Sequence, residues 1–184
     1  MANTEQQMAE KKNIVLIGFM GSGKTVVGRH LARELDYDFV DTDEAIADVT
    51  GMPLPRLIKK HGEIRFRSEE ELVIRKLSQK EHQVVACGGS ISEPGGQRLQ
   101  PLKEQGYFVL LQAPPEVILQ RISRKSNRAM PLSRVDKENI AALLEQRQQP
   151  YAENADLIVN TGEISVEEAA LLIAEQYRRC CGIS

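Results

Sequence analysis

The stretch GFMGSGKT, residues 18–25, decides the fold, because it fits the pattern G-x-x-x-x-G-K-[ST] in full. It follows the apolar run Ile14–Ile17, which predicts a buried strand, and it opens the run Gly23–Leu35, where apolar residues recur at helical spacing. Strand, glycine-rich turn and helix are the context in which this pattern forms a phosphate-binding loop, the P-loop. We therefore prefer this interpretation to a chance glycine turn before a helix.

The residue types of this loop suit a nucleoside triphosphate and its magnesium ion. Glycines let the backbone turn tightly and aim its amide groups at phosphate oxygens, and the positive end of the next helix faces the same point. Lys24 is expected to bind the β- and γ-phosphates, and Thr25 is expected to bind the magnesium ion. The predicted ATP-binding residues of the loop are Gly21, Ser22, Gly23, Lys24, Thr25 and Val26.

Two carboxylates at a second strand end supply what a magnesium site needs. The segment DFVDTD, residues 38–43, carries Asp41 and Asp43 after the short strand Phe39-Val40. Alternate residues of a strand face the same side, so both carboxylates are expected to point into one cleft. The alternative is a plain acidic strand end, in which Asp43 caps the helix that follows it.

Short apolar runs and longer amphipathic stretches alternate along the chain. Strands are also predicted at 84–86, 107–111 and 157–159, and helices at 63–79, from Pro114-Pro115, at 136–148 with a stop near Pro150, and at 166–177. This alternation predicts an α/β protein with a parallel sheet and helices on both faces, a three-layer α/β/α domain. The basic stretch Ser123–Val135 interrupts it and is typical of a long mobile loop with a function.

The composition limits the partners of the protein. The chain has 184 residues with 41% hydrophobic and 27% charged residues, which suits one globular domain at 13–184 behind a flexible tail at 1–12. A net charge of -2 gives no basic surface for nucleic acid, and no apolar run approaches the roughly 18 residues of a membrane span. Three cysteines without zinc or disulfide spacing favour a reducing compartment, so we expect a cytoplasmic protein.

The order of the motifs resembles the shikimate kinases. After GFMGSGKT come DTD at 41–43, GEIRFRSEE at 62–70, CGGS at 87–90, the basic loop, and QRQQPY at 146–151. The resemblance runs from Ile14 to about Gly162 and implies a nucleoside-monophosphate-kinase-like P-loop fold with a five-stranded sheet of order 2-3-1-4-5 and a mobile lid at about 123–135. It also implies a monomeric enzyme that uses ATP and Mg²⁺ to phosphorylate the 3-hydroxyl of shikimate, on the route to aromatic amino acids.

On the nucleotide side, the resemblance assigns further roles by position in the motifs. Lys24 is one catalytic residue, and Arg128 is a second, reaching from the lid to the phosphates of ATP. Arg121 lies against the adenine. Thr25 and Asp41 hold the magnesium ion, Asp41 through water.

On the acceptor side, Asp43 is implied to orient the reacting hydroxyl and to accept its proton. Arg67 and Arg147 are implied to grip the shikimate carboxylate, which suits the planar fork of arginine. Gly88 and Gly89 bring backbone amides to the acceptor. Plainer alternatives remain for the two arginines, because Arg67 has glutamates one turn away and Arg147 lies near a helix end.

Three departures from the family pattern keep other interpretations open. Ser90 stands where the family has a third glycine, the lid reads R-A-M-P from Arg128, and the proline after Arg147 is displaced by one residue. Rivals for the lid arginine are Arg124, Lys125 and Arg134. The alternatives for the function are a P-loop kinase of another small hydroxy acid, such as gluconate, and a non-catalytic relative that binds nucleotide.

Overall fold

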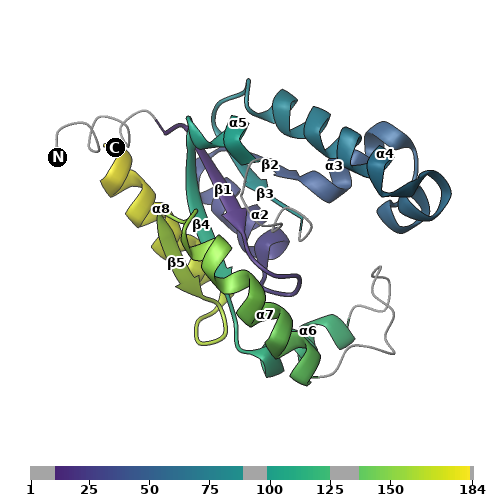
Figure 1. The fold of residues 1–184 in the computed structure, drawn as a ribbon. Helices are drawn as coiled ribbons and strands as arrows, with labels where there is room; N and C mark the ends of the chain where they lie inside the picture. The colour runs from purple at the N-terminus through teal and green to yellow at the C-terminus, as the bar shows by residue number, and fades with distance from the viewer. Residues whose placement is uncertain (1–10, 89–98, 125–136, 183–184) are drawn as a thin grey trace.

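The computed structural model describes residues 11–88, 99–124 and 137–182, and the description that follows concerns these ranges. They form a parallel sheet of five strands in the order β2-β3-β1-β4-β5, which confirms the predicted fold class and order (Figure 1). The strands are β1 Asn13–Ile17, β2 Asp38–Asp41, β3 Gln83–Ala86, β4 Gly106–Gln112 and β5 Leu157–Asn160. The helices are α2 Lys24–Leu35, α3 Thr42–Thr50, α4 Leu54–Leu77, α5 Gln100–Lys103, α6 Pro115–Ser123, α7 Lys137–Ala152 and α8 Val166–Cys181.

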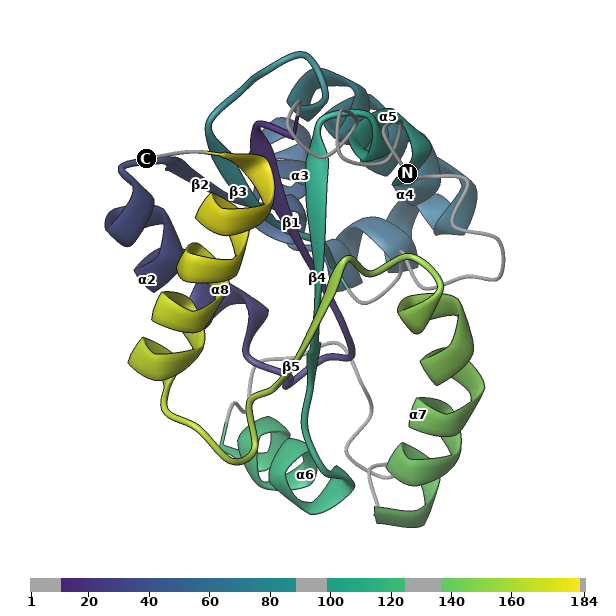
Figure 2. The same ribbon diagram turned by 90° about the vertical axis from the view of Figure 1, so that its left-hand side faces the viewer.

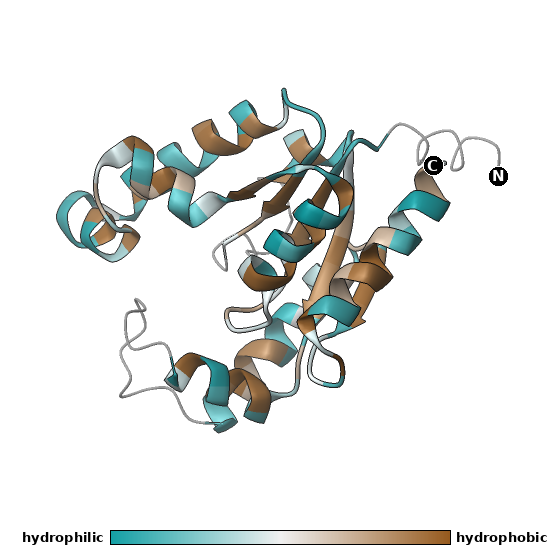
Figure 3. Cartoon of the chain, turned by 180° about the vertical axis from the view of Figure 1, so that it is seen from behind, coloured by the Kyte–Doolittle hydropathy of each residue, from teal (hydrophilic) through white to brown (hydrophobic). Residues whose placement is uncertain are grey.

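The strands are apolar on both faces because helices cover both faces. Alternate residues of β1 divide between the two sides: Ile14 and Leu16 pack toward α2 and α8, whereas Val15 and Ile17 pack toward α4 and α5. Figure 2 shows α2 and α8 on one side of the sheet and α4 and α5 on the other. Figure 3 shows the hydrophobic colour concentrated on the strands between these two layers.

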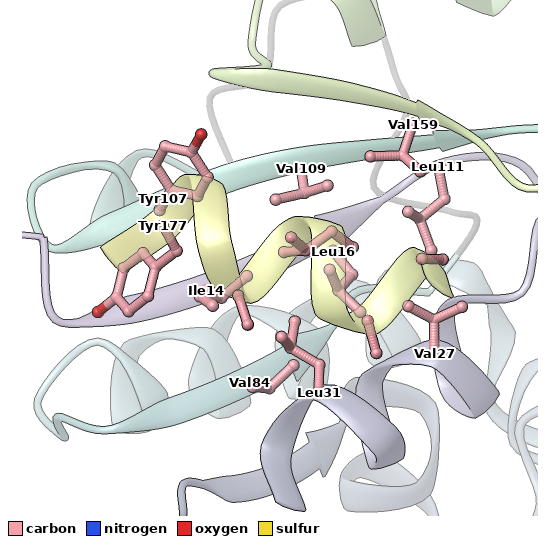
Figure 4. Packing of buried hydrophobic residues seen from close by; sticks show 14 of the residues in the cluster. Ile14, Leu16, Val27, Leu31, Val84, Tyr107, Val109, Leu111, Val159 and Tyr177 are labelled. Atoms are coloured by element: carbon pink, nitrogen blue, oxygen red, sulfur yellow. The ribbon is translucent and has the colours of Figure 1, made fainter. Parts of the chain in front are cut away.

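The layer under α2 and α8 holds the two largest fully buried side chains, Tyr107 and Tyr177. Val27 and Leu31 of α2 and Tyr177 of α8 belong to one cluster with the strand residues Ile14 and Leu16, in which Tyr177 lies at one end and Val27 at the other (Figure 4). Because α2 begins directly after the P-loop, its burial against the sheet fixes the position of the loop at the carboxyl ends of the strands. Ligands of open parallel sheets bind at this edge.

Two predicted helices have bounds that differ from those in the structure. The helix predicted at 63–79 is part of the longer α4, which starts at Leu54 and is interrupted at Gly62, where φ is 81° and ψ is 171°. Such backbone angles are reserved for glycine, so one glycine joins two helical segments. The helix predicted at 136–148 is α7, which runs on to Ala152, just past the stop expected near Pro150. Only the last turn lies beyond this proline, so little of the helical hydrogen bonding is lost.

The helix α3 follows β2 without a loop, and the alternative in which Asp43 caps it is not found. The N-cap is Asp41, whose Oδ1 accepts a hydrogen bond from the backbone N–H of Asp43 at 3.0 Å. Asp43 itself lies in the first helical turn, where a carboxylate is favoured by the helix dipole. The sequence pattern suggested that the two aspartates alternate along one strand. In the structure Asp41 ends β2 and Asp43 lies in α3.

The ends of the described chain add two observations. The Lys12 N–H donates to the carbonyl of Gln105 at 2.8 Å, and Lys11 pairs with Asp156 at 2.7 Å, so both lysines belong to the folded domain. The remainder of the predicted tail, 1–10, lies outside the described residues. No helix among the described residues is long and apolar enough to cross a membrane. Cys87, Cys180 and Cys181 are free in this structure.

Candidate active site

A cavity of about 710 Å³ opens at the carboxyl ends of the strands. Its wall combines the P-loop, the start of α3, the end of β3, α6 and the turn between β5 and α8. The polar and glycine residues that line it are Gly21, Gly23, Lys24, Thr25, Asp41, Asp43, Glu44, Gly88, Arg121, Arg124, Thr161 and Ser165. The structure thus brings most of the predicted ATP-site residues together with both aspartates.

The backbone of the P-loop takes the shape that its glycines permit. Gly18, Gly21 and Gly23 have φ values of 140°, 81° and 104°, in the region that side-chain-bearing residues rarely adopt. Lys24 folds back over the loop, and its Nζ donates to the carbonyl oxygens of Gly18 at 2.7 Å and Phe19 at 3.0 Å. The lysine charge is therefore held beside the loop amides, where a phosphate chain would lie.

Thr25 and Asp41, which both line the cavity, bring a hydroxyl oxygen and a carboxylate oxygen together. The Thr25 hydroxyl donates to Asp41 Oδ2 at 2.8 Å, while the other carboxylate oxygen is engaged as the α3 N-cap. No group of three or more histidine, cysteine or carboxylate ligands gathers among the described residues. One hydroxyl and one carboxylate fit Mg²⁺, which keeps several waters and takes further oxygens from substrate phosphates.

The neighbouring ends of β2 and β3 place Asp43 against Gly88. The two strands pair in parallel register up to Asp41 and Ala86, so the segments after them emerge side by side. The Gly88 N–H donates to Thr42 Oγ1 at 2.9 Å, and a methyl group on Gly88 would overlap Asp43 Oδ1 and lie 2.8 Å from its Cγ. The Gly88 amide is thus used by Thr42, and what Gly88 provides to the site is room for the Asp43 carboxylate.

The guanidinium of Arg121 joins the P-loop to the turn after β5. Its Nη1 donates to Thr161 Oγ1 at 2.9 Å and to the Gly21 carbonyl at 3.3 Å, and its Nη2 donates to the Thr161 carbonyl at 2.7 Å. These bonds lie in the guanidinium plane. Arg121 lines the cavity, as its predicted place beside the adenine requires.

Arg67 and Arg147 are not among the residues that line this cavity. Arg67 pairs with Glu63 at 3.0 Å and with the buried Glu70 at 3.1 Å, so the ion pairs one turn away are formed. The Arg147 guanidinium lies over the ring of Phe19, 5.4 Å from its centroid. The two arginines stand on α4 and α7, and their joint grip on a carboxylate stays a prediction.

Some predicted site residues fall outside the described part of the chain. These are Gly89, Ser90, Arg128 and the rivals Lys125 and Arg134, together with most of the predicted lid. Arg124, the remaining rival, lines the cavity. Val26 also lines it and is partly exposed, as its place in the predicted ATP site requires.

Cys87 lines the cavity next to Gly88 but is not suited to nucleophilic chemistry. Its side chain is buried, and this burial raises the pKa of the thiol well above its ordinary value, although nearby Lys24 acts in the opposite direction. Only the thiolate is a strong nucleophile. Cys87 therefore serves as a small apolar wall residue.

Sequence reasoning missed two threonines of this site. Thr42 accepts the Gly88 N–H, and Thr161 contacts both Arg121 and the P-loop. Each directly follows a strand of the structure, β2 or β5, and lies two residues after the strand predicted there, at the sheet edge where ligands bind. That position was the available signal, but a threonine hydroxyl in a turn has too many local uses for the pattern to single it out.

Comparison with known proteins places this geometry in a family. A family model described as shikimate kinase matches residues 20–178. A shikimate kinase of Pelotomaculum thermopropionicum is 47% identical over 86% of this chain and 91% of its own length. One from Thermodesulfovibrio yellowstonii is 42% identical over 91% of this chain and 96% of its own length.

Solved structures agree with this placement. A shikimate kinase from Acinetobacter baumannii in complex with shikimate has a TM-score of 0.80 and 34% identity, covering 94% of this chain and 96% of that one. A gluconokinase from Sinorhizobium meliloti, with a TM-score of 0.59 over 91% of this chain and 93% of its own, is 19% identical and shares the fold alone. Its sequence, its sheet order and the residues that line its cavity together show that the chain belongs to the shikimate kinase family.

Proposed function

We propose that this protein transfers the γ-phosphoryl group of ATP to the 3-hydroxyl of shikimate, giving shikimate 3-phosphate and ADP. The observation that carries the proposal is one cavity that holds both the P-loop lysine and the Asp43 carboxylate, in a chain of this family. A phosphate cradle and a carboxylate that can orient a hydroxyl are the two parts that phosphoryl transfer to a small alcohol needs.

The nucleotide is held from two ends. The glycine-rich loop and Lys24 surround the phosphates, with the α2 dipole adding positive potential at the same point. Arg121 offers the face of its guanidinium to the adenine, because its plane is fixed by bonds to Thr161 and the loop. These contacts hold the γ-phosphoryl group in position for in-line attack.

Magnesium fits beside Thr25 and Asp41, whose oxygens lie 2.8 Å apart. When bound with ATP, the ion would neutralise charge on the β- and γ-phosphate oxygens. Asp41 is held at the strand end by its bonds to Thr25 and to the start of α3, so its carboxylate needs no rearrangement to face the ion or a water on it.

Asp43 is proposed to accept a hydrogen bond from the 3-hydroxyl and to take its proton as the oxygen attacks. Gly88 keeps space for this carboxylate at the sheet edge. Arg67 and Arg147 are proposed to bind the shikimate carboxylate, and Arg128 to reach the phosphates. Closure around both substrates would bring α4 and α7, which carry the first two of these arginines, toward the cavity and exclude water.

The proposal also takes the protein to be a cytoplasmic monomer that binds neither nucleic acid nor membrane. The expectation that it binds no nucleic acid is supported by the net charge of -2, which offers no attraction to anionic polymers. Size-exclusion chromatography with light scattering tests the monomer.

A coupled assay of ADP release tests the function. Shikimate, gluconate and a nucleoside monophosphate are offered as acceptors with Mg-ATP, and the phosphorylated product is identified by mass spectrometry. We expect turnover with shikimate that far exceeds turnover with the other two. Brisk turnover of gluconate without turnover of shikimate would reject the proposal, and nucleotide binding with no turnover of any acceptor would favour a non-catalytic relative.

A further inference from the structure

Thr161 is a buried polar residue whose hydroxyl serves distant parts of the chain. Only 4% of its surface is exposed, and it lines the cavity. Its Oγ1 lies 2.7 Å from the carbonyl of Ser22 and 3.1 Å from that of Gln112. A hydroxyl has one proton to donate. The Gln112 carbonyl already accepts the Thr161 backbone N–H at 2.8 Å, so the nearer Ser22 carbonyl is the acceptor that the hydroxyl proton serves.

The bond to Ser22 has a consequence on the other side of the same peptide. A trans peptide is planar, and its carbonyl and N–H point in opposite directions. Holding the Ser22 carbonyl on Thr161 therefore also fixes the direction of the Gly23 N–H. Gly23 is the N-cap of α2, and its N–H is one of the amides with which loops of this pattern bind phosphate.

The neighbouring peptide is held from the same side. Arg121 Nη1 donates to the Gly21 carbonyl at 3.3 Å and to Thr161 Oγ1 at 2.9 Å. The threonine hydroxyl thus accepts from the arginine and donates to the loop. It links the residue expected at the adenine with the peptide expected at the phosphates. A threonine that merely stabilised its own turn would bond locally, whereas these partners are 139 and 40 residues away.

We propose that Thr161 is a positioning residue of the phosphate cradle, which sets the Ser22–Gly23 peptide so that the Gly23 N–H faces the phosphates of the nucleotide. The proposal rests on the proposed function only in that the loop binds a phosphate chain. It does not depend on which acceptor is used. Thr161 is not a residue of the loop, so its removal changes how the cradle is shaped and leaves each of the loop's own residues in place.

The test removes the hydroxyl and keeps the shape. Thr161→Val is nearly isosteric and leaves the Ser22 carbonyl without its donor, whereas Thr161→Ser keeps the donor. Calorimetry measures binding of ATP and of inorganic tripolyphosphate, both with magnesium, because the second probe has phosphates and no adenine. We expect Thr161→Val to lower the affinity for both probes about tenfold, as the loss of one buried hydrogen bond predicts. Thr161→Ser keeps the donor and is expected to bind both probes with affinities within about twofold of the wild-type values.

The matched control is Thr50→Val, in which the lost hydroxyl donates to the Ile46 carbonyl at 2.8 Å within α3, away from the cavity lining. It is expected to lower the melting temperature without changing affinity for either probe. If Thr161→Val does not fold, Thr161→Ala provides a smaller replacement for the same measurements.

Wild-type affinities in a folded Thr161→Val or Thr161→Ala protein would overturn the proposal, and so would a Thr161→Ser protein as weak as the valine variant. Failure of the proposed function looks different, because the wild type would then bind both probes and yet leave shikimate unphosphorylated.

Discussion

Gly88→Ala is a sharp test of the idea that Gly88 makes room for the Asp43 carboxylate, the group proposed to act on the acceptor hydroxyl. Gly88 does not have a positive φ, so alanine suits its backbone and the substitution adds only a methyl group. That methyl group would overlap Asp43 Oδ1 and lie 2.8 Å from Asp43 Cγ. The group that must yield is the end of a short polar side chain in the first turn of α3, so the protein is expected to fold.

The displacement sets the magnitude. Carbon atoms in contact prefer separations of about 3.5 to 4.0 Å, so the carboxylate carbon must retreat by about 0.7 Å and the overlapped oxygen by more. A reacting group misplaced by about 1 Å costs on the order of 100-fold in rate. We expect kcat with shikimate to fall about 100-fold, with the Kd of Mg-ATP unchanged, because no contact of the P-loop is touched.

A double-mutant cycle shows whether the loss passes through Asp43. Steady-state kinetics are measured for Gly88→Ala, Asp43→Asn and the double variant, with calorimetry for Mg-ATP. If the methyl group acts by moving the carboxylate, it has little left to damage once Asp43 has become asparagine, and the two losses are strongly non-additive.

Two results would refute the reasoning. One is a Gly88→Ala enzyme with kcat close to the wild-type value. The other is a cycle in which the two losses simply multiply, since Gly88 would then act on the reaction independently of Asp43.

The remaining predictions concern the cradle, the α4 interruption and pH. Lys24→Ala should lower turnover at least about 100-fold, because the charge held beside the loop amides is lost; retained activity in the ADP-release assay contradicts it. Gly62→Ala should lower the free energy of unfolding by about 1–3 kcal/mol in urea titrations. A methyl group at Gly62 has open space around it, so the cost comes from the backbone angles alone, which alanine adopts only with strain; an unchanged midpoint contradicts this. Burial raises the pKa of Cys87 above its ordinary value of 9.0, so the unfolded state loses its proton first and stability should fall as pH rises past 9; Cys87→Ala should show a shallower fall, and equal slopes contradict the assignment.

The fold could be predicted from this sequence because its strongest signals are local. Ile14–Ile17 and Tyr107–Leu111 are uninterrupted apolar runs, which are typical of a strand covered on both faces, and both lie in inner strands of the sheet. The P-loop pattern predicts a turn in which several glycines have positive φ, and the structure has such values at Gly18, Gly21 and Gly23. The sheet order itself came from the family resemblance, because alternation of elements does not determine which strands are neighbours.

The rest depends on contacts that no local pattern encodes. The capping of α3 by Asp41 instead of Asp43 follows from where β2 ends, and a shift of one or two residues there is beyond what propensities resolve. Thr161 reaches Ser22 across 139 residues, and its role becomes visible only when β5 is placed in the sheet. Arg67 and Arg147 show the reverse case, in which the family resemblance assigns a role that their contacts with glutamates and a phenylalanine ring do not display.

The division of Asp41 between two bonds has a consequence for redesign. One of its oxygens accepts from Thr25 and the other accepts from the main chain at Asp43, so a single side chain ties the residue proposed to hold magnesium to the start of the helix that carries the residue proposed to act on the acceptor. Anyone retargeting this enzyme to a new alcohol would have to keep position 41 as it is and remodel residues further along α3 and α4. A library that randomised position 41 would lose both substrates together, whatever acceptor it was selected to use.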